Sequence, residues 1–299
     1  MNWVYLLPIS IWQLKVSSMN ENFVTQIANQ IASRIVRNSG YLARQEIAAL
    51  IDKIRTDPLR LEPFGFKVYS QNDEDGIIEE IMRRLKINAG NFCEIGVENG
   101  LECNSLYLIH KGWRGVWIEA NLKQKVDILS KFKSIIPARL ELVTEMVTAD
   151  NINGLLSENL SKLEQFDFLS IDIDGNDIYL LEALVLRPKV ICIEYNAKFA
   201  GNIVKSQVYD PNKEWVGTDY MGASLKAIAD VAEKKGYQLV GTNIVGCNAF
   251  FVRSDLVEGL FCQNASSEYL YNPSRYWLFF DHFQNIGHRP DFGLYVDLK

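Results

Sequence analysis

Hydrophobic and polar positions follow two rhythms that alternate along the chain from about residue 66. Short apolar runs, such as 115–119 and 190–195, are typical of buried strands, whereas apolar residues three to four apart, as in 77–85, are typical of helices. The same patterns predict further strands at 91–95, 140–147, 166–173, 237–242 and 248–253, and further helices at 104–111, 121–133, 152–163, 178–184 and 224–235. Strands that alternate with helices imply right-handed crossovers and a mainly parallel sheet.

The last two expected strands, 237–242 and 248–253, are joined by a short loop, which suggests an antiparallel hairpin. We therefore predict an α/β fold with a doubly wound sheet of five parallel strands plus this C-terminal hairpin. Helical periodicity over 21–56, ended by Asp57-Pro58, predicts an N-terminal helical extension. The expected organisation is an extension at 1–60, one domain at 61–255 and an aromatic tail at 256–299 that packs on the domain.

Composition narrows the class of protein. The chain has 299 residues, of which 48% are hydrophobic, so it can bury a core without stabilisation by disulfide bonds or metal ions. Its 31 basic and 37 acidic residues give a net charge of −6, which argues against nucleic acid as a partner. Five cysteines without a CxxC pair indicate reduced thiols, and we expect a cytoplasmic location.

The apolar segment 3–12 is too short to span a bilayer, which takes about 20 residues. No Lys or Arg precedes it, so the basic region of a signal peptide is missing, and Met19 offers an alternative start. We expect no transmembrane span, and peripheral membrane contact through 3–12 is the functional alternative to translation that starts at Met19. The helices of 21–56 suggest a homodimer.

The strand at 91–95 leads into Glu94-x-Gly96-x-x-x-Gly100, a glycine turn that lets a ligand approach the backbone. Ligands of open α/β sheets bind at the carboxyl ends of the strands. The spacing is neither GxGxxG nor a phosphate-binding loop, and the carboxylates of Glu94 and Glu98 suit a cationic ligand such as a sulfonium. Glu119 ends the next strand and can accept both hydroxyls of a ribose. Together these residues describe an adenosine-type pocket.

These motifs, followed by Ile171-Asp-Ile-Asp-Gly-Asn-Asp177 and preceded by Tyr69-Ser-Gln-Asn-Asp-Glu-Asp-Gly-Ile-Ile78, resemble a class I S-adenosylmethionine-dependent methyltransferase. The chain is most similar to the FkbM-like group, many of which O-methylate sugars, over 66–255. One departure is Glu98, which stands where the family has its middle glycine. The resemblance implies a Rossmann-like methyltransferase sheet and S-adenosyl-L-methionine as cofactor. It implies cofactor contacts at Gln71, Asn72, Glu94, Gly96, Asn99, Gly100, Glu119, Met146, Val147 and Asp172.

Carboxylates also gather where the strands at 166–173 and 190–195 end. Asp172 and Asp174 share one face, as do Glu194 and Asn196, and neighbouring parallel strands bring these ends together. Oxygen ligands suit Mg²⁺ or Ca²⁺, as in metal-dependent O-methyltransferases, so Asp172, Glu194 and Asn196 are candidate metal ligands. Alternatively, Asp172 contacts the cofactor amine while Asp174 and Asp177 cap the next helix.

The candidate catalytic residues are Asp172, Asp174 and Asn196, and without a metal Asp174 or Asp172 is the first candidate for general base. The long connection 197–221 is a candidate substrate lid, whose aromatic side chains suit stacking on a sugar ring. Those aromatic residues are Tyr209, Trp215 and Tyr220. A structural role is favoured for His110. His282 and His288 could fold over the pocket as a base or metal ligand, but a solvated or core-edge role is favoured for them too.

The sequence therefore predicts an S-adenosylmethionine-dependent O-methyltransferase that acts on a sugar or glycoconjugate hydroxyl, in surface polysaccharide synthesis. One alternative is a non-catalytic scaffold protein with a relic cofactor pocket. Another is a nicotinamide-dependent oxidoreductase, which fits Glu119 but not the glycine spacing. Methylation of nucleic acid is disfavoured by the acidic balance and by the absence of an NPPY-like signature.

Overall fold

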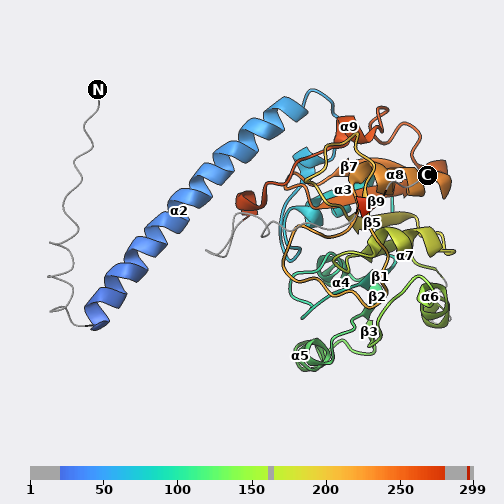
Figure 1. Ribbon diagram of the computed structural model, residues 1–299, viewed down its shortest axis with the longest axis horizontal. Helices are drawn as coiled ribbons and strands as arrows, with labels where there is room; N and C mark the ends of the chain where they lie inside the picture. Colours follow the sequence, from blue (N-terminus) through green and yellow to red (C-terminus); the bar gives the residue numbers. More distant parts are fainter. Residues whose placement is uncertain (1–20, 161–164, 280–294, 297–299) are drawn as a thin grey trace. The chain divides into compact units, whose positions relative to one another are not determined.

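The computed structural model describes residues 21–160, 165–279 and 295–296. The chain divides into two compact units, Met1–Glu46 and Ile47–Lys299. Helix α2 (Glu21–Ile54), the long blue helix of Figure 1, includes the boundary between them and confirms the helix expected at 21–56. No helix in the described part of the chain is long and apolar enough to cross a membrane. The apolar segment 3–12 lies outside the described residues.

A seven-stranded sheet organises the second unit, in the order β3-β2-β1-β4-β5-β8-β7. Figure 1 labels β3, β2, β1, β5 and β7 of this sheet. The strands are β1 (Asn91–Ile95), β2 (Arg114–Ile118), β3 (Leu140–Val143), β4 (Phe168–Ile171), β5 (Val190–Glu194), β7 (Tyr237–Thr242) and β8 (Asn248–Arg253). Strands β1 to β5 pair in parallel, whereas β8 pairs antiparallel with both β5 and β7. The predicted doubly wound sheet of five parallel strands plus an antiparallel C-terminal hairpin is confirmed.

Helices cover both faces of this sheet. They are α3 (Glu74–Arg84), α4 (Leu106–His110), α5 (Leu122–Phe132), α6 (Ile152–Leu160), α7 (Asp177–Ala183) and α8 (Leu225–Lys234). One core joins side chains of α6, α7 and α8 to one face of the strands, and a second core joins α3, α4 and α5 to the other. Adjacent residues of β1 show the split, because Cys93 belongs to the first core and Phe92 to the second.

Helix boundaries follow local capping chemistry. The side chain of Asn121 accepts hydrogen bonds from the backbone N–H groups of Lys123 and Gln124 and begins α5. The hydroxyl of Ser224 caps α8 by accepting a hydrogen bond from the backbone N–H of Ala227. Gly236 follows α8 with a φ of +81°, a left-handed conformation that glycine adopts without strain and that ends the helix.

The connection at 197–221 and the chain after β8 are more structured than expected. Strand β6 (Ser206–Gln207) pairs antiparallel with β9 (Tyr295–Val296). The tail also contains the 3₁₀ helices η2 (Ser254–Leu256) and η3 (Tyr276–Phe279) and the helix α9 (Ser267–Leu270), and η1 (Glu62–Phe64) precedes α3. Leu270 is fully buried, and the hydroxyl of Tyr195 donates to the carbonyl of Asn272 at 2.6 Å, so this part of the tail packs on the sheet.

Candidate active site

A cavity of about 850 Å³ opens at the carboxyl ends of the parallel strands. This is the edge at which open α/β sheets bind their ligands. Ten of the predicted site residues line it: Gln71, Asn72, Glu94, Gly96, Glu119, Met146, Val147, Asp172, Asp174 and Glu194. Three others, Asn99, Gly100 and Asn196, are not among the lining residues.

Gly96 allows β1 and β4 to approach each other at this edge. Its φ is +80°, and a Cβ atom there would lie 1.7 Å from the carbonyl oxygen of Asp172. Gly100 has a different role, because a Cβ atom at Gly100 would meet the ring of Trp117 at 2.6 Å. The first glycine therefore shapes the cavity, whereas the second makes room for the core and not for a ligand.

Glu94 fixes the loop that follows the glycine turn. Its carboxylate accepts hydrogen bonds from the backbone N–H of Asn104 at 2.7 Å and of Ser105 at 2.9 Å. Burial raises the pKa of Glu94 to about 7, although these hydrogen bonds act in the opposite direction. Glu94 thus lines the cavity and also orders the chain ahead of α4.

Glu119, just after β2, holds the glycine turn from the other side. Its Oε2 accepts from the backbone N–H of Val97 at 3.2 Å and of Glu98 at 2.8 Å, and its Oε1 accepts from Asn121 at 2.8 Å. Glu98 adopts a left-handed φ of +47°, so the departure from the family's middle glycine leaves the turn intact. A carboxylate has about four acceptor positions, so Glu119 can accept a further donor from the cavity.

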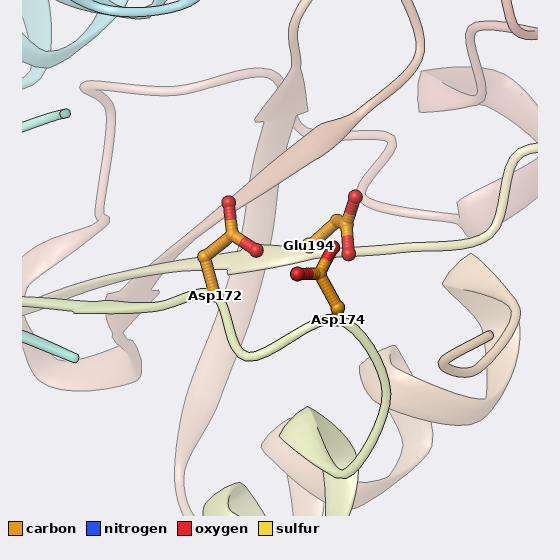
Figure 2. Close-up of side chains that lie close together, drawn as sticks. All are labelled: Asp172, Asp174 and Glu194. Carbon is orange, nitrogen blue, oxygen red and sulfur yellow. The ribbon is translucent and has the colours of Figure 1, made fainter. Parts of the chain in front are cut away.

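Three carboxylates converge where β4 and β5 end. Asp172, Asp174 and Glu194 each offer an oxygen, and these atoms all lie within 4.8 Å of one another (Figure 2). Glu194 is only 8% exposed, and its Oε2 has no hydrogen-bond partner among the described residues. An isolated buried acceptor of this kind is costly unless a ligand supplies the missing contact.

The carboxylates of this cluster resist ionisation. Burial, and then repulsion from Asp174, raises the pKa of Asp172 well above its usual value, and burial with repulsion from Asp172 does the same for Glu194. The pKa of Asp174 rises to about 6, through burial first and then the charges of Asp177 and Glu98. At neutral pH the cluster therefore favours a bound proton or a cation.

Asp177 closes the turn between β4 and α7. Its Oδ1 accepts from the N–H of Ile173 at 2.9 Å, and its Oδ2 accepts from the N–H of Gly175 at 2.8 Å. These bonds hold Asp174 at a left-handed φ of +56°. Asp177 is the first residue of α7, so its hydrogen bonds hold the preceding turn and do not cap the helix, whereas the carboxyl group of Asp174 lies in the cluster.

Asn196 lies outside the cavity, in contrast to the sequence expectation. Its side-chain amide donates to the carbonyls of Asp219 at 2.9 Å and Met221 at 2.8 Å, and its Oδ1 accepts from the N–H of Lys198. Strand β5 ends at Glu194, so the alternation that would place residues 194 and 196 on one face no longer applies. We therefore replace Asn196 by Asp174 in the candidate ligand set.

The connection contributes one aromatic side chain to the cavity. Trp215 lines it and donates from Nε1 to the carbonyl of Thr218 at 2.7 Å. Tyr209 packs against the ring of Tyr179, with 5.0 Å between ring centroids. The ring centroid of Tyr220 lies 3.7 Å from Nζ of Lys213. The expected group of three stacking residues is therefore reduced to Trp215.

The residues that line the cavity and that sequence reasoning did not single out include Asn248 and Tyr276. Both lie far along the chain from the motifs, and only the pairing of β8 with β5 could have indicated Asn248. His110 stacks on Tyr69 with 4.9 Å between ring centroids, which fits the structural role expected for it. His282 and His288 lie outside the described residues.

No family model matches the sequence, and no curated protein matches it. Solved structures similar to this chain include an O-methyltransferase from Bacillus cereus in complex with S-adenosylhomocysteine (SAH), at 19% identity and a TM-score of 0.40 over 70% of this chain and 88% of that one. The magnesium protoporphyrin IX methyltransferase from Synechocystis PCC 6803 with bound SAH is 13% identical, with a TM-score of 0.42 over 62% and 83% of the two chains.

A third similar structure is the N-terminal domain of EvdMO1 in the presence of SAH and D-fucose. It is 13% identical, with a TM-score of 0.40 over 70% of this chain and 96% of that one. These likenesses are too weak to assign an activity, so we infer the function from the residues of the cavity.

Proposed function

We propose that this protein is an S-adenosylmethionine-dependent O-methyltransferase of the FkbM-like group, which methylates a hydroxyl of a sugar or glycoconjugate. The observation that carries the proposal is that one cavity contains both a candidate site for the cofactor and a candidate site for proton transfer. At the end of β2, the carboxylate of Glu119 is of the kind that accepts hydrogen bonds from ribose. At the ends of β4 and β5, the carboxylates of Asp172, Asp174 and Glu194 form a cluster that can accept a proton. A cytoplasmic location fits the five described cysteines, all of which are free thiols.

The cavity fits the cofactor in charge and in shape. Glu119 keeps acceptor capacity for one further donor such as a ribose hydroxyl, and Gly96 allows the close approach of β1 and β4 that shapes this end of the cavity. Met146 and Val147, after β3, offer apolar surface to an adenine. When bound, S-adenosylmethionine supplies an electrophilic methyl group and a positive charge, which the acidic lining would stabilise.

Asp174 is the residue that we assign as general base. Its carboxyl group belongs to the cluster in the cavity, and its pKa of about 6 lies close to neutral pH. A base with a pKa near the working pH combines a large ionised fraction with a strong drive to take the hydroxyl proton. The structure around Asp174 is set by Asp177, which orients the turn and does not face the acceptor.

The same cluster fits a divalent cation. Asp172 and Glu194 would hold it, with Asp174 close enough to be a third ligand, and the unpartnered Oε2 of Glu194 is an oxygen ready to bind it. A cation there would bind an acceptor oxygen and lower the pKa of its hydroxyl.

Replacing Glu119 by glutamine should weaken SAH binding about 10- to 100-fold, because a hydrogen bond to a charged group contributes about 1.5–3 kcal/mol. Isothermal titration calorimetry with SAH measures the change, and NAD should not bind to the wild type. Asp127→Asn is the matched control, because it removes the same charge from the exposed surface of α5. Equal SAH affinity in wild type and Glu119→Gln would remove Glu119 from the ribose site.

Millimolar Mg²⁺ or Mn²⁺ should raise the midpoint of thermal unfolding of the wild type by several degrees, because a cation relieves the repulsion among the three carboxylates. Asp172→Asn should abolish this rise, whereas Asp150→Asn, which changes an exposed aspartate, should retain it. A rise of the same size in both variants would show that the cation binds elsewhere. No rise in the wild type would leave Asp174 acting without a metal.

A further inference from the structure

The segment Tyr69–Ile78, singled out in the sequence, builds a buried polar frame beside the cavity. The Oδ2 atom of Asp75 accepts hydrogen bonds from the backbone N–H groups of Val68, Tyr69 and Ser70, at 2.6 to 2.9 Å. Glu74 is fully buried, and it stands two residues after Asn72, which lines the cavity. The carboxylates of Glu74 and Asp75 are therefore directed into the protein, where they order this segment beside the cavity.

Glu74 connects this segment to the hairpin of β7 and β8. Its Oε1 accepts from the side-chain amides of Asn72 at 3.1 Å, Asn243 at 2.9 Å and Asn248 at 3.0 Å. A carboxylate oxygen accepts hydrogen bonds, so each asparagine must turn its NH₂ group toward it. For Asn248 this orientation directs the other end of the amide, Oδ1, away from Glu74.

The Oδ1 atom of Asn248 is a buried acceptor that lacks a donor. Asn248 is 3% exposed, lines the cavity, and its Oδ1 has no partner among the described residues. It pairs in register with Glu194 across β5 and β8, so the two side chains are neighbours on one face of the sheet. Two adjacent buried oxygens, Oδ1 of Asn248 and Oε2 of Glu194, therefore lack donors in the same cavity.

The charge of the cavity limits what can supply those donors. Its lining contains nine acidic residues and two lysines, Lys67 and Lys213. Lys67 forms an ion pair with Glu102, and Lys213 donates to Gln207 and to the carbonyl of Tyr220, so both lysines are already engaged. An anionic ligand would meet an excess of negative charge in a space of low dielectric constant.

We propose that Asn248 binds the methyl acceptor, and that the acceptor is a neutral or positively charged polyhydroxyl compound with neighbouring donor groups. One hydroxyl faces the cluster of Asp172, Asp174 and Glu194, and a neighbouring hydroxyl or amine donates to Oδ1 of Asn248. The acidic lining disfavours acceptors with a net negative charge, such as those that carry phosphate or carboxylate groups. The inference rests on the proposed function and adds to it the charge class of the acceptor and the residue that orients it.

The test uses the full-length protein saturated with SAH and three pyranose probes that differ in charge. The probes are methyl α-D-glucopyranoside, which is neutral, D-glucosamine, which is cationic, and D-glucuronate, which is anionic, and saturation-transfer NMR titrations give their affinities. The two probes without negative charge should bind at least tenfold more tightly than glucuronate. Asn248→Ala should weaken binding of the neutral probe at least fivefold and leave SAH affinity within twofold.

Asn243→Ala is the matched control, because Asn243 donates to the same oxygen of Glu74 but does not line the cavity. It should retain the probe affinities of the wild type, and thermal unfolding checks that both variants are folded. The inference is overturned if glucuronate binds as well as the other probes, if no probe binds, or if Asn248→Ala has no effect beyond that of Asn243→Ala. A wild type that binds no SAH would instead refute the proposed function, and this inference with it.

Discussion

Asp174→Asn should lower kcat for methyl transfer about 100- to 10,000-fold, the usual contribution of a positioned general base. Asparagine keeps the size of the side chain but cannot accept a proton from the hydroxyl. The rate is measured as SAH released with an acceptor that supports turnover. SAH affinity should stay within twofold, because the carboxyl group of Asp174 takes part in the cluster and not in the pocket around Glu119.

The pH profile of the wild type provides a second measurement of the same role. Burial and the charges of Asp177 and Glu98 raise the pKa of Asp174 to about 6. Only the ionised carboxylate takes a proton, so kcat should rise as the pH increases through about 6 and level off above it. Asp210→Asn, which removes a carboxylate of the connection that does not line the cavity, should keep this profile. A wild-type rate in Asp174→Asn would contradict the assignment.

The sheet could be predicted from the sequence because most of its strands are buried on both faces. Strands of that kind are nearly continuous apolar runs, and β1, β7 and β8 have the bounds that the pattern predicts. Strands β3 and β4 are shorter than expected. After Ile171 the chain turns toward Asp174, whose left-handed φ is incompatible with a strand, although the sequence there continues to alternate.

The candidate site was predictable where it depends on strand ends and not where it depends on side-chain partners. Glu119 and Glu194 follow directly from the ends of β2 and β5. Asn196 was misplaced because its amide finds backbone carbonyls of the connection, and no local pattern reveals them. Asn248 was missed because its orientation depends on Glu74, which is remote in sequence and reaches it only through the fold.

Gly96→Ala should destabilise the protein by about 2–5 kcal/mol, the sum of left-handed strain and overpacking, and should weaken SAH binding at least tenfold. The added methyl group would lie 1.7 Å from the carbonyl oxygen of Asp172, a backbone atom that cannot rotate away. The ends of β1 and β4 must then separate, which moves Asp172 and the glycine turn relative to each other. Chemical denaturation and SAH titration measure the two effects.

Gly112→Ala separates conformational strain from this collision. Gly112 has a φ of +94°, also in the left-handed region, but a Cβ atom there meets nothing within 4 Å. The control should therefore lose only about 1–2 kcal/mol and bind SAH like the wild type. Equal losses in the two variants would mean that the close approach of Gly96 to Asp172 is not what holds the cavity in shape. A larger loss at Gly96, with weaker SAH binding, would tie the packing of β1 against β4 directly to the cofactor site.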